Sequence, residues 1–149
     1  MKKEIFNLQQ LFNSEIPISK ELGVTVQSLT EKEIQLELPL EPNRNHKGTS
    51  FGGSLYSGCA LACYGIFLSQ LRSLGIQTMD IVISKGEIKY LAPVKADAQI
   101  VAGFRTLEEK AAFFRGLQAK GKARATMHAQ VRVAGVLCAE FFGDFVAKI

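Results

Sequence analysis

The spacing of apolar residues changes along this chain, and each change predicts a different structural element. Near the N-terminus, apolar residues recur at helical intervals (Ile5, Leu8, Leu11 and Phe12), which predicts a short amphipathic helix over residues 4–13. Pro17 is expected to end this helix. Residues 23–29 read as a strand, and the strict apolar–polar alternation over residues 34–40 is the pattern of a half-buried strand.

An irregular stretch over residues 42–51, rich in Asn, Gly and Thr, separates these strands from the longest apolar segment. After Gly52 and Gly53 the sequence predicts a helix to about Leu74, with Gly75 as its C-terminal cap. This helix is apolar nearly all round, so it has to be covered on several sides. Its most apolar part, residues 55–71, is interrupted by Gly, Ser and Gln and is short and polar for a membrane span.

The rest of the chain is mostly β, with strands expected over residues 81–91, 98–104, 122–133 and 137–147. The last two alternate strictly, and Gly135 predicts the tight turn between them. The capping-box spacing of Thr106 and Glu109 predicts an intervening helix to about Leu117, which Gly121 ends. The sequence therefore predicts an α+β fold in which a curved antiparallel sheet wraps one long central helix.

The composition indicates a single folded domain over residues 1–149. Hydrophobic residues make up 47% of the chain and charged residues 21%, so disorder is not indicated. The three cysteines are an odd number, and the N-terminus turns polar before an apolar run of signal length develops. A reducing, cytoplasmic location without membrane association is therefore expected.

The net charge of +4 is carried by residues 105–124, here called the basic segment, where six basic minus two acidic residues give the whole excess. Such a segment suits a phosphate-bearing ligand or an acidic protein partner, and an ordinary solvated face is the alternative. Nucleic-acid binding is not expected, because the segment is small and no recognition motif accompanies it.

Residues 45–55, 87–94 and 121–145 carry a resemblance to a known family. The first reads Asn-His-Lys-Gly-Thr-Ser-Phe-Gly-Gly-Ser-Leu and resembles the hotdog thioesterase loop that runs Asn-x-x-Gly-Thr-x-His-Gly-Gly into the central helix. The second is similar to the strand that follows that helix, and the third to the closing hairpin. With the first two strands, nearly the whole chain resembles the hotdog superfamily and, within it, the YiiD carboxy-terminal thioesterase family.

The resemblance implies a hotdog fold, assembled as a homodimer or dimer of dimers with active sites at the dimer interface. It also implies hydrolysis of a fatty-acyl thioester of coenzyme A or acyl carrier protein. No metal or cofactor is expected. Cys59 and Cys63 share a helix face, but no nearby His or Asp completes a zinc site, so packing is their expected role.

Thioester hydrolysis needs a polarised carbonyl, which the start of the central helix can provide through its unpaired N–H groups. Gly52 and Gly53 lack side chains, so their amides are expected to form an oxyanion hole; the alternative is that they only begin a crowded helix. Asn45 is a candidate to hold the water or the thioester, with an Asx turn as its alternative role. His46, a candidate base or a surface residue, and Thr49 are candidate substrate contacts.

The second need, an activated water, is where the chain departs from the family pattern. Related thioesterases usually place His before the glycine pair and an acid on the following helix, whereas these positions hold Phe51 and Ala60 here. No acid occurs between Gly53 and Leu74. The candidate replacements are Ser54 or Ser57 to position a water, Tyr56 to donate to it, and Asp80 or Glu87 to arrive from the sheet across the dimer.

The acyl chain needs an apolar slot. Phe51, Tyr90 and Phe104 are candidates to line it, with ordinary core positions as the alternative. Arg105 and Lys122 are candidates to bind the phosphates of coenzyme A or the acidic surface of a carrier protein.

Two functions remain open at this point. The first is an acyl thioesterase, and the second is a non-catalytic acyl-thioester binder or sensor that keeps the fold and the glycine loop but lacks a base. A hotdog dehydratase or hydratase is not expected, because that chemistry requires a well-placed general acid and base.

Overall fold

The computed structural model describes residues 2–149, which form four α-helices, one 3₁₀ helix and six strands. In chain order these are α1 (Lys2–Glu15), α2 (Ile18–Leu22), β1 (Thr25–Leu29), β2 (Ile34–Leu38), the 3₁₀ helix η1 (Glu41–Asn43), α3 (Gly52–Ser73), β3 (Ile81–Tyr90), β4 (Ala98–Phe104), α4 (Leu107–Lys120), β5 (Lys122–Val133) and β6 (Val136–Lys148). Every helix and strand expected from the sequence is present, and their ends shift by only a few residues.

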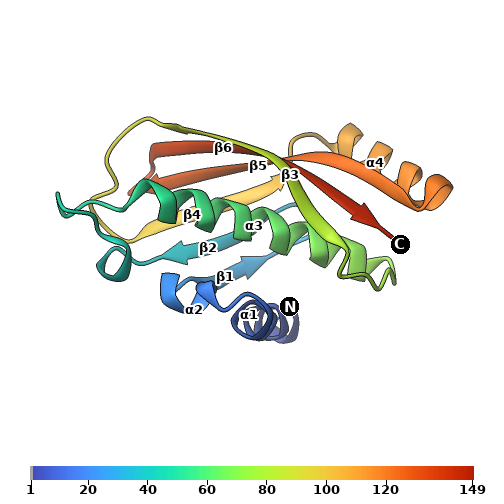
Figure 1. Cartoon of the computed structure of the whole chain (residues 1–149), viewed down its shortest axis with the longest axis horizontal. Coiled ribbons are helices and arrows are strands. Elements are labelled where there is room, and N and C mark those ends of the chain that lie inside the picture. Colours follow the sequence, from blue (N-terminus) through green and yellow to red (C-terminus); the bar gives the residue numbers. More distant parts are fainter. Residues whose placement is uncertain (1) are drawn as a thin grey trace.

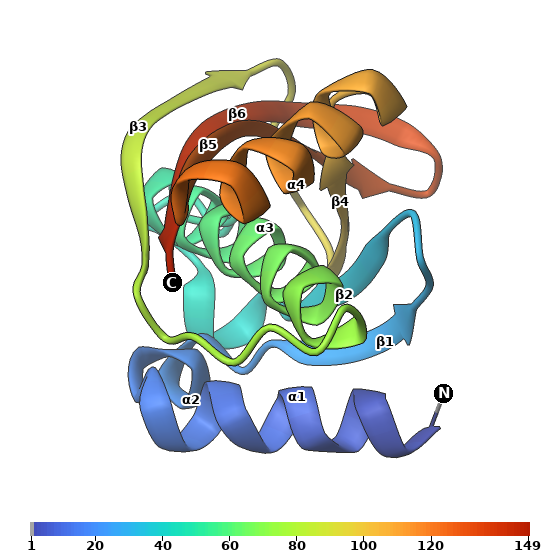
Figure 2. The ribbon, with the colours of Figure 1, turned by 90° about the vertical axis from the view of Figure 1, so that its right-hand side faces the viewer.

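The strands form one antiparallel sheet in the order β1-β2-β4-β5-β6-β3. The sheet curves around α3, while α1 and α2 run along its β1 edge and α4 packs beside β5 (Figures 1 and 2). A long helix wrapped by a curved antiparallel sheet is the hotdog architecture. The predicted α+β hotdog fold is therefore confirmed.

The helix α3 is enclosed on several sides, as its apolar composition requires. Among residues 2–149 it is the one helix long and apolar enough to cross a membrane, but 67% of its most apolar window is buried inside the fold. Two glycines let neighbours approach its backbone. A Cβ at Gly58 would lie 2.6 Å from a methyl of Ile100, and one at Gly65 would lie 2.7 Å from the ring of Phe12. This helix is the core of the domain.

The hairpin of β5 and β6 shows how directly the alternation sets the buried face. The inward residues of β6 are all buried: Ala139, Phe141, Gly143, Phe145 and Ala147. The turn has two residues, Ala134 and Gly135, with φ of 49° and 80°. Two successive positive φ values give the type I′ turn that suits the twist of a hairpin, and Gly135 stands where the sequence placed it.

Sequence periodicity did not predict α2. The helix α1 ends at Glu15, but Pro17 does not begin a loop, because it is the N-cap of α2, which Gly23 ends with φ 74°. Proline suits a helix start, since its missing N–H would have no helical partner there. A helix of five residues is too short for apolar periodicity to reveal.

Candidate active site

The loop before α3 is held by hydrogen bonds to separate parts of the fold. Asn43 is buried, and its Nδ2 donates to the carbonyl of Leu22 at 2.7 Å. The carbonyl of Asn43 accepts from the amide of Phe51 at 2.6 Å, and the amide of Ser50 donates to the carbonyl of Val94 at 2.8 Å. These bonds fix the chain immediately before α3 and therefore set where the helix begins.

Asn45 closes the turn at the tip of this loop. Its Oδ1 accepts from the amides of Lys47 (2.9 Å) and Thr49 (3.2 Å), and its Nδ2 donates to the hydroxyl of Thr49 at 3.0 Å. Asn45 and Thr49 thus have the loop-shaping role, and their direct contact with substrate stays a prediction. His46 is exposed at the tip, and its ring has no hydrogen-bond partner within residues 2–149.

The first two amides of α3 have no hydrogen-bond acceptor among the described residues 2–149. The amides of Ser54 and Leu55 both donate to the carbonyl of Phe51, at 3.0 and 3.1 Å, but those of Gly52 and Gly53 remain unpaired. The 22 residues of α3 span about 33 Å at 1.5 Å per residue, so these amides stand at the positive end of a long helix dipole. The arrangement can bind an oxygen that carries negative charge.

Tyr90, at the end of β3, packs against this first turn. Its hydroxyl donates to the carbonyl of Gly52 at 2.8 Å, and a Cβ at Gly52 would lie 3.2 Å from the tyrosine ring. Desolvation of the hydroxyl raises the pKa of Tyr90. The structure therefore brings Tyr90 and Gly52 together, and the contact of Tyr90 with an acyl chain stays a prediction.

A cavity of about 410 Å³, here called the Ser50 cavity, lies beside the same turn. Its polar wall includes Lys47, Ser50 and Gly52, and its apolar wall includes Leu55 and residues 91–94. Ser50 is only 7% exposed, and among residues 2–149 its Oγ is the one buried side-chain oxygen or nitrogen without a hydrogen-bond partner. A buried hydroxyl left unpaired costs about 1–3 kcal/mol. The sequence analysis did not single out Ser50, because its burial depends on a segment more than 40 residues away.

The hydroxyls on the next turn of α3 are partly engaged. Ser57 Oγ donates to the carbonyl of Gly53 at 2.9 Å, while Ser54 is half-buried directly after the glycine pair. The ring of Tyr56 meets Phe141 edge-on at 5.1 Å, and its hydroxyl occupies the space that a side chain at Gly86 would fill. Ser54, Tyr56 and Ser57 thus lie near the unpaired amides, and their role towards water stays a prediction.

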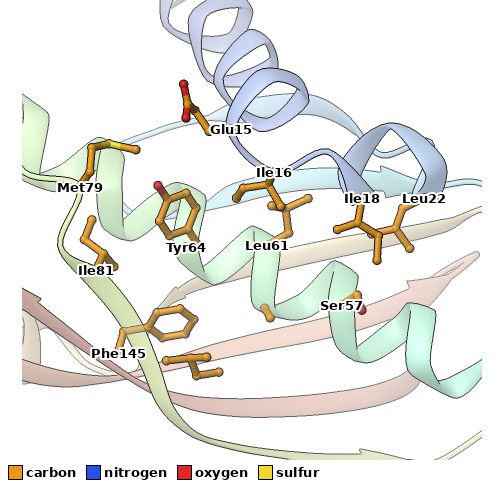
Figure 3. A pocket seen from close by; sticks show the side chains of 12 residues that line it. Glu15, Ile16, Ile18, Leu22, Ser57, Leu61, Tyr64, Met79, Ile81 and Phe145 are labelled. Carbon is orange, nitrogen blue, oxygen red and sulfur yellow. The ribbon is translucent and has the colours of Figure 1, made fainter.

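An apolar groove of about 470 Å³ runs along α3 from Ser57 to Tyr64 (Figure 3). The other walls come from the link between α1 and α2, from α2, from the segment that leads into β3, from β3 and from β6: Ile16, Ile18, Leu22, Met79, Ile81, Ile83 and Phe145. Ala60 also lines this groove, so the position of the usual acid faces the groove without a carboxylate. The groove starts one helical turn after Gly53 and suits an apolar chain.

The acids named from the sequence do not replace that carboxylate within one chain. Gly86 and Tyr90 face α3, so Glu87 between them points to the opposite face of the sheet. Asp80 is exposed at the other end of β3. Glu15 lines the groove, but beside Tyr64 at its far end (Figure 3).

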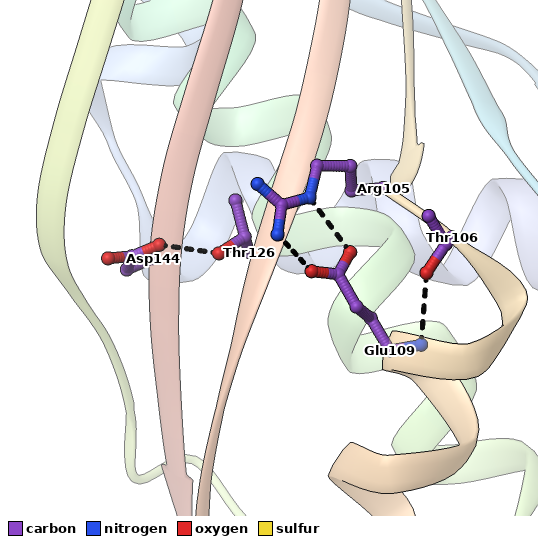
Figure 4. A network of polar contacts seen from close by, with 5 residues as sticks. All are labelled: Arg105, Thr106, Glu109, Thr126 and Asp144. Atoms are coloured by element: carbon purple, nitrogen blue, oxygen red, sulfur yellow. Dashed lines mark hydrogen bonds and ion pairs between the residues drawn. The ribbon is translucent and has the colours of Figure 1, made fainter.

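The basic segment lies at the end of the molecule where α3 finishes, whereas Gly52 and Gly53 lie where α3 begins (Figure 1). Arg105 there pairs with Glu109 through its Nε at 3.0 Å, and this hydrogen bond lowers the pKa of Glu109 (Figure 4). Within one chain, Arg105 and Lys122 are therefore separated from the glycine pair.

The three aromatic residues expected to line one slot are also separated. Phe104 packs in the core with Phe67 and Phe113, each at a ring distance of 6.0 Å, so the core alternative holds for it. Phe51 and Tyr90 are 58% and 54% exposed at the start of α3. The aromatic slot was thus wrong for Phe104, because the end of β4 lies near the far end of α3.

Cys59 and Cys63 are fully buried, and burial raises the pKa of Cys59 to about 12 and that of Cys63 well above its usual value. Their expected packing role is confirmed. Within residues 2–149 no group of three or more His, Cys, Asp or Glu side chains is placed to hold a metal ion.

Comparison with known proteins agrees with this fold. A family model described as "Putative thioesterase (yiiD_Cterm)" matches residues 5–149. A thioesterase from Shewanella oneidensis, itself described as putative, is 29% identical with a TM-score of 0.86, and the match covers 100% of both chains. A Chlorobaculum tepidum protein of unknown function is 31% identical with a TM-score of 0.87, covering 95% of this chain and 92% of that one. A Haemophilus influenzae thioesterase shares the fold at 15% identity, with a TM-score of 0.75 over 97% of this chain and 90% of that one.

Proposed function

We propose, from the premise that this chain belongs to the YiiD carboxy-terminal thioesterase family, that it hydrolyses a fatty-acyl thioester of coenzyme A or acyl carrier protein. The observation that carries the proposal is the pair of unpaired amides at Gly52 and Gly53, one helical turn from an apolar groove. The family relationship supports a thioester as the ligand. The amides and the groove support the way in which it binds.

In the proposed reaction, the amides of Gly52 and Gly53 donate to the thioester oxygen. Water attacks the carbonyl carbon and the oxygen becomes negatively charged. The carbonyl then re-forms as the carbon–sulfur bond breaks, and a proton from the attacking water passes to the departing sulfur, so that a thiol and a fatty acid are released. Preorganised donors stabilise the charged oxygen, by about 2.7–4 kcal/mol for each donor. Ser54 and Ser57, which lie on one face of α3, hold the attacking water.

The acyl chain lies in the groove, along Ser57, Leu61 and Tyr64. From Gly53 to Tyr64 the helix rises about 16 Å at 1.5 Å per residue. Each carbon–carbon bond of an extended chain advances about 1.25 Å, taking a bond of 1.52 Å and an angle near 111°. The groove therefore matches a chain of about 12 to 14 carbons, and each methylene buried there adds about 0.8 kcal/mol.

A homodimer through β3 completes the assembly. The other sheet edge, β1, is protected, because the side chain of Gln9 accepts from the amide of Val26 at 2.7 Å and donates to the carbonyl of Val24 at 3.2 Å. The outer edge of β3 has no strand partner within residues 2–149 and carries exposed apolar side chains, among them Val82 and Ile83. An unpaired apolar edge favours pairing with a second copy.

Antiparallel pairing of β3 with its own copy explains how the separated residues meet. It sets the Tyr90 end of one strand beside the Ile81 end of the other. At the start of β3, Ile81 pairs with Ala147 on β6. The next residue of β6, Lys148, pairs with Lys122 on β5. Lys122 is therefore two strands away from the start of β3, a distance of about 10 Å. The partner subunit's basic segment then approaches the first subunit's Gly52, where it can meet the phosphates of coenzyme A.

The absence of a carboxylate on α3 favours a second candidate, a protein that binds acyl thioesters without hydrolysing them. One experiment separates the two. Purified protein is mixed with acyl-CoA and acyl-carrier thioesters of 8 to 18 carbons, and thiol release and binding are both measured. Thiol release with a preference near 12 to 14 carbons supports the thioesterase, and binding without release supports the second function. If the protein neither binds nor hydrolyses any of these thioesters, both functions are contradicted.

Light scattering tests the assembly. A dimer or tetramer at micromolar concentration is expected, and a stable monomer contradicts the pairing through β3.

A further inference from the structure

Ser50 carries a buried hydroxyl that can still form a hydrogen bond. Its Oγ is buried without a hydrogen-bond partner in residues 2–149, and the residue as a whole is 7% exposed. Its backbone is firmly held, because its amide donates to the carbonyl of Val94 at 2.8 Å and Phe51 next to it donates to Asn43 at 2.6 Å. The backbone of Ser50 is therefore fixed, whereas its buried hydroxyl has no partner among the described residues.

Ser50 shares its cavity with the unpaired amide of Gly52. The apolar part of its wall comes from Leu55 and residues 91–94. The Oγ is enclosed in the free protein and no hydrogen bond holds it, so donation into the cavity requires χ1 to rotate between staggered rotamers. Two donors of this kind, close together beside a helix N-terminus, fit one acceptor oxygen.

We propose that Ser50 is a catalytic residue that donates a hydrogen bond to the thioester oxygen, together with the amide of Gly52. The inference rests on the proposed function and adds a side-chain donor to the oxyanion hole. It assigns the thioester head group to the mouth of the Ser50 cavity, with Lys47 at the rim near the anionic carrier arm. The hydrogen bond from such a donor becomes stronger as negative charge develops on the oxygen. Its loss is therefore expected to lower kcat more than it weakens substrate binding.

The test uses two non-hydrolysable probes that differ at one group. S-(2-oxodecyl)-coenzyme A keeps a carbonyl near the thioester position, and S-decyl-coenzyme A lacks it. Ser50→Ala removes the donor, Ser50→Cys keeps the volume with a much weaker donor, and Ser73→Ala makes the same change at the far end of α3. Binding is measured by calorimetry, turnover by thiol release, and stability by thermal unfolding.

Ser50→Ala and Ser50→Cys are expected to bind the carbonyl probe about tenfold more weakly while binding the alkyl probe as the wild type does, with kcat reduced about 10²–10³-fold. Thermal stability should not fall, because the hydroxyl has no partner to lose in the free protein. Ser73→Ala should match the wild type in both binding measurements.

Equal losses for both probes, or a stability loss that parallels the activity loss, would overturn the proposal in favour of a packing role. Unchanged turnover in both Ser50 variants, with hydrolysis intact in the wild type, would reject Ser50 alone and leave the proposed function standing. A wild type that neither binds the probes nor releases thiol would reject both.

Discussion

Replacing Gly52 by proline removes one proposed oxyanion donor while leaving the helix start intact. The amide of Gly52 has no acceptor in residues 2–149, so the fold loses no hydrogen bond. Proline is favoured at the first position of a helix, and the preceding residue must be extended. Phe51 already has φ −62° and ψ 134°, which proline accepts.

The matched control is Gly52→Ala, which keeps the N–H. In both variants a Cβ would approach the ring of Tyr90 to 3.2 Å, and Tyr90 is 54% exposed, so its ring can move by a few tenths of an ångström. Because both variants share this contact, the difference in kcat between them reports the loss of the N–H donor at residue 52 and of substrate access to that position. Loss of one oxyanion donor costs about 2.7–4 kcal/mol of transition-state stabilisation, or about 10²–10³ in kcat.

Thiol release from a 12-carbon acyl-CoA measures kcat, and thermal unfolding checks that both variants fold. Gly52→Pro is expected to keep its stability within about 1 kcal/mol of the control, while its kcat falls at least a hundredfold below that of Gly52→Ala. A kcat within threefold of the alanine control, in a folded protein, would refute the assignment of this amide to the thioester oxygen.

Three further predictions concern the fold. Phe67 is fully buried among Phe104, Phe113 and Phe145, so Phe67→Ala should lower the free energy of unfolding by about 3–5 kcal/mol, measured by urea denaturation. The matched change Phe51→Ala, at a side chain 58% exposed, should stay within about 0.5 kcal/mol, and similar losses at the two sites would contradict the core assignment. The Thr106 hydroxyl accepts from the amide of Glu109 at 3.1 Å and caps α4, so Thr106→Ala should cost about 1 kcal/mol by the same assay, whereas Thr106→Ser should retain most of the stability. The three cysteines are buried, two on α3 and one on β6, with the pKa of Cys59 raised to about 12, so a disulfide reagent that labels thiols at pH 8 should react with them only as the protein unfolds; rapid labelling of the native protein would contradict their burial.

Most of the architecture could be predicted from the sequence, because local periodicity reports which face of an element is buried. The alternation in β5 and β6 and the positive-φ requirement at Gly135 are local signals, and the structure agrees with both. The cap of α4 at Thr106 is equally local, since donor and acceptor are three residues apart. The short helix α2 escaped prediction because its five residues give no period to detect.

Only part of the candidate site could likewise be predicted from local sequence features. The sequence identified Gly52 and Gly53, because a helix start with two small residues is a local feature with a known electrostatic consequence. Only the tertiary structure decided that the hydroxyl of Ser50 is buried and unpaired, since that depends on Val94 and the end of β3 closing over it. It also decided that α2 supplies a wall of the acyl groove, and that the basic segment stands at the opposite end of α3 from the glycines. These facts arise from contacts between segments distant in sequence, which the period of the apolar pattern cannot encode.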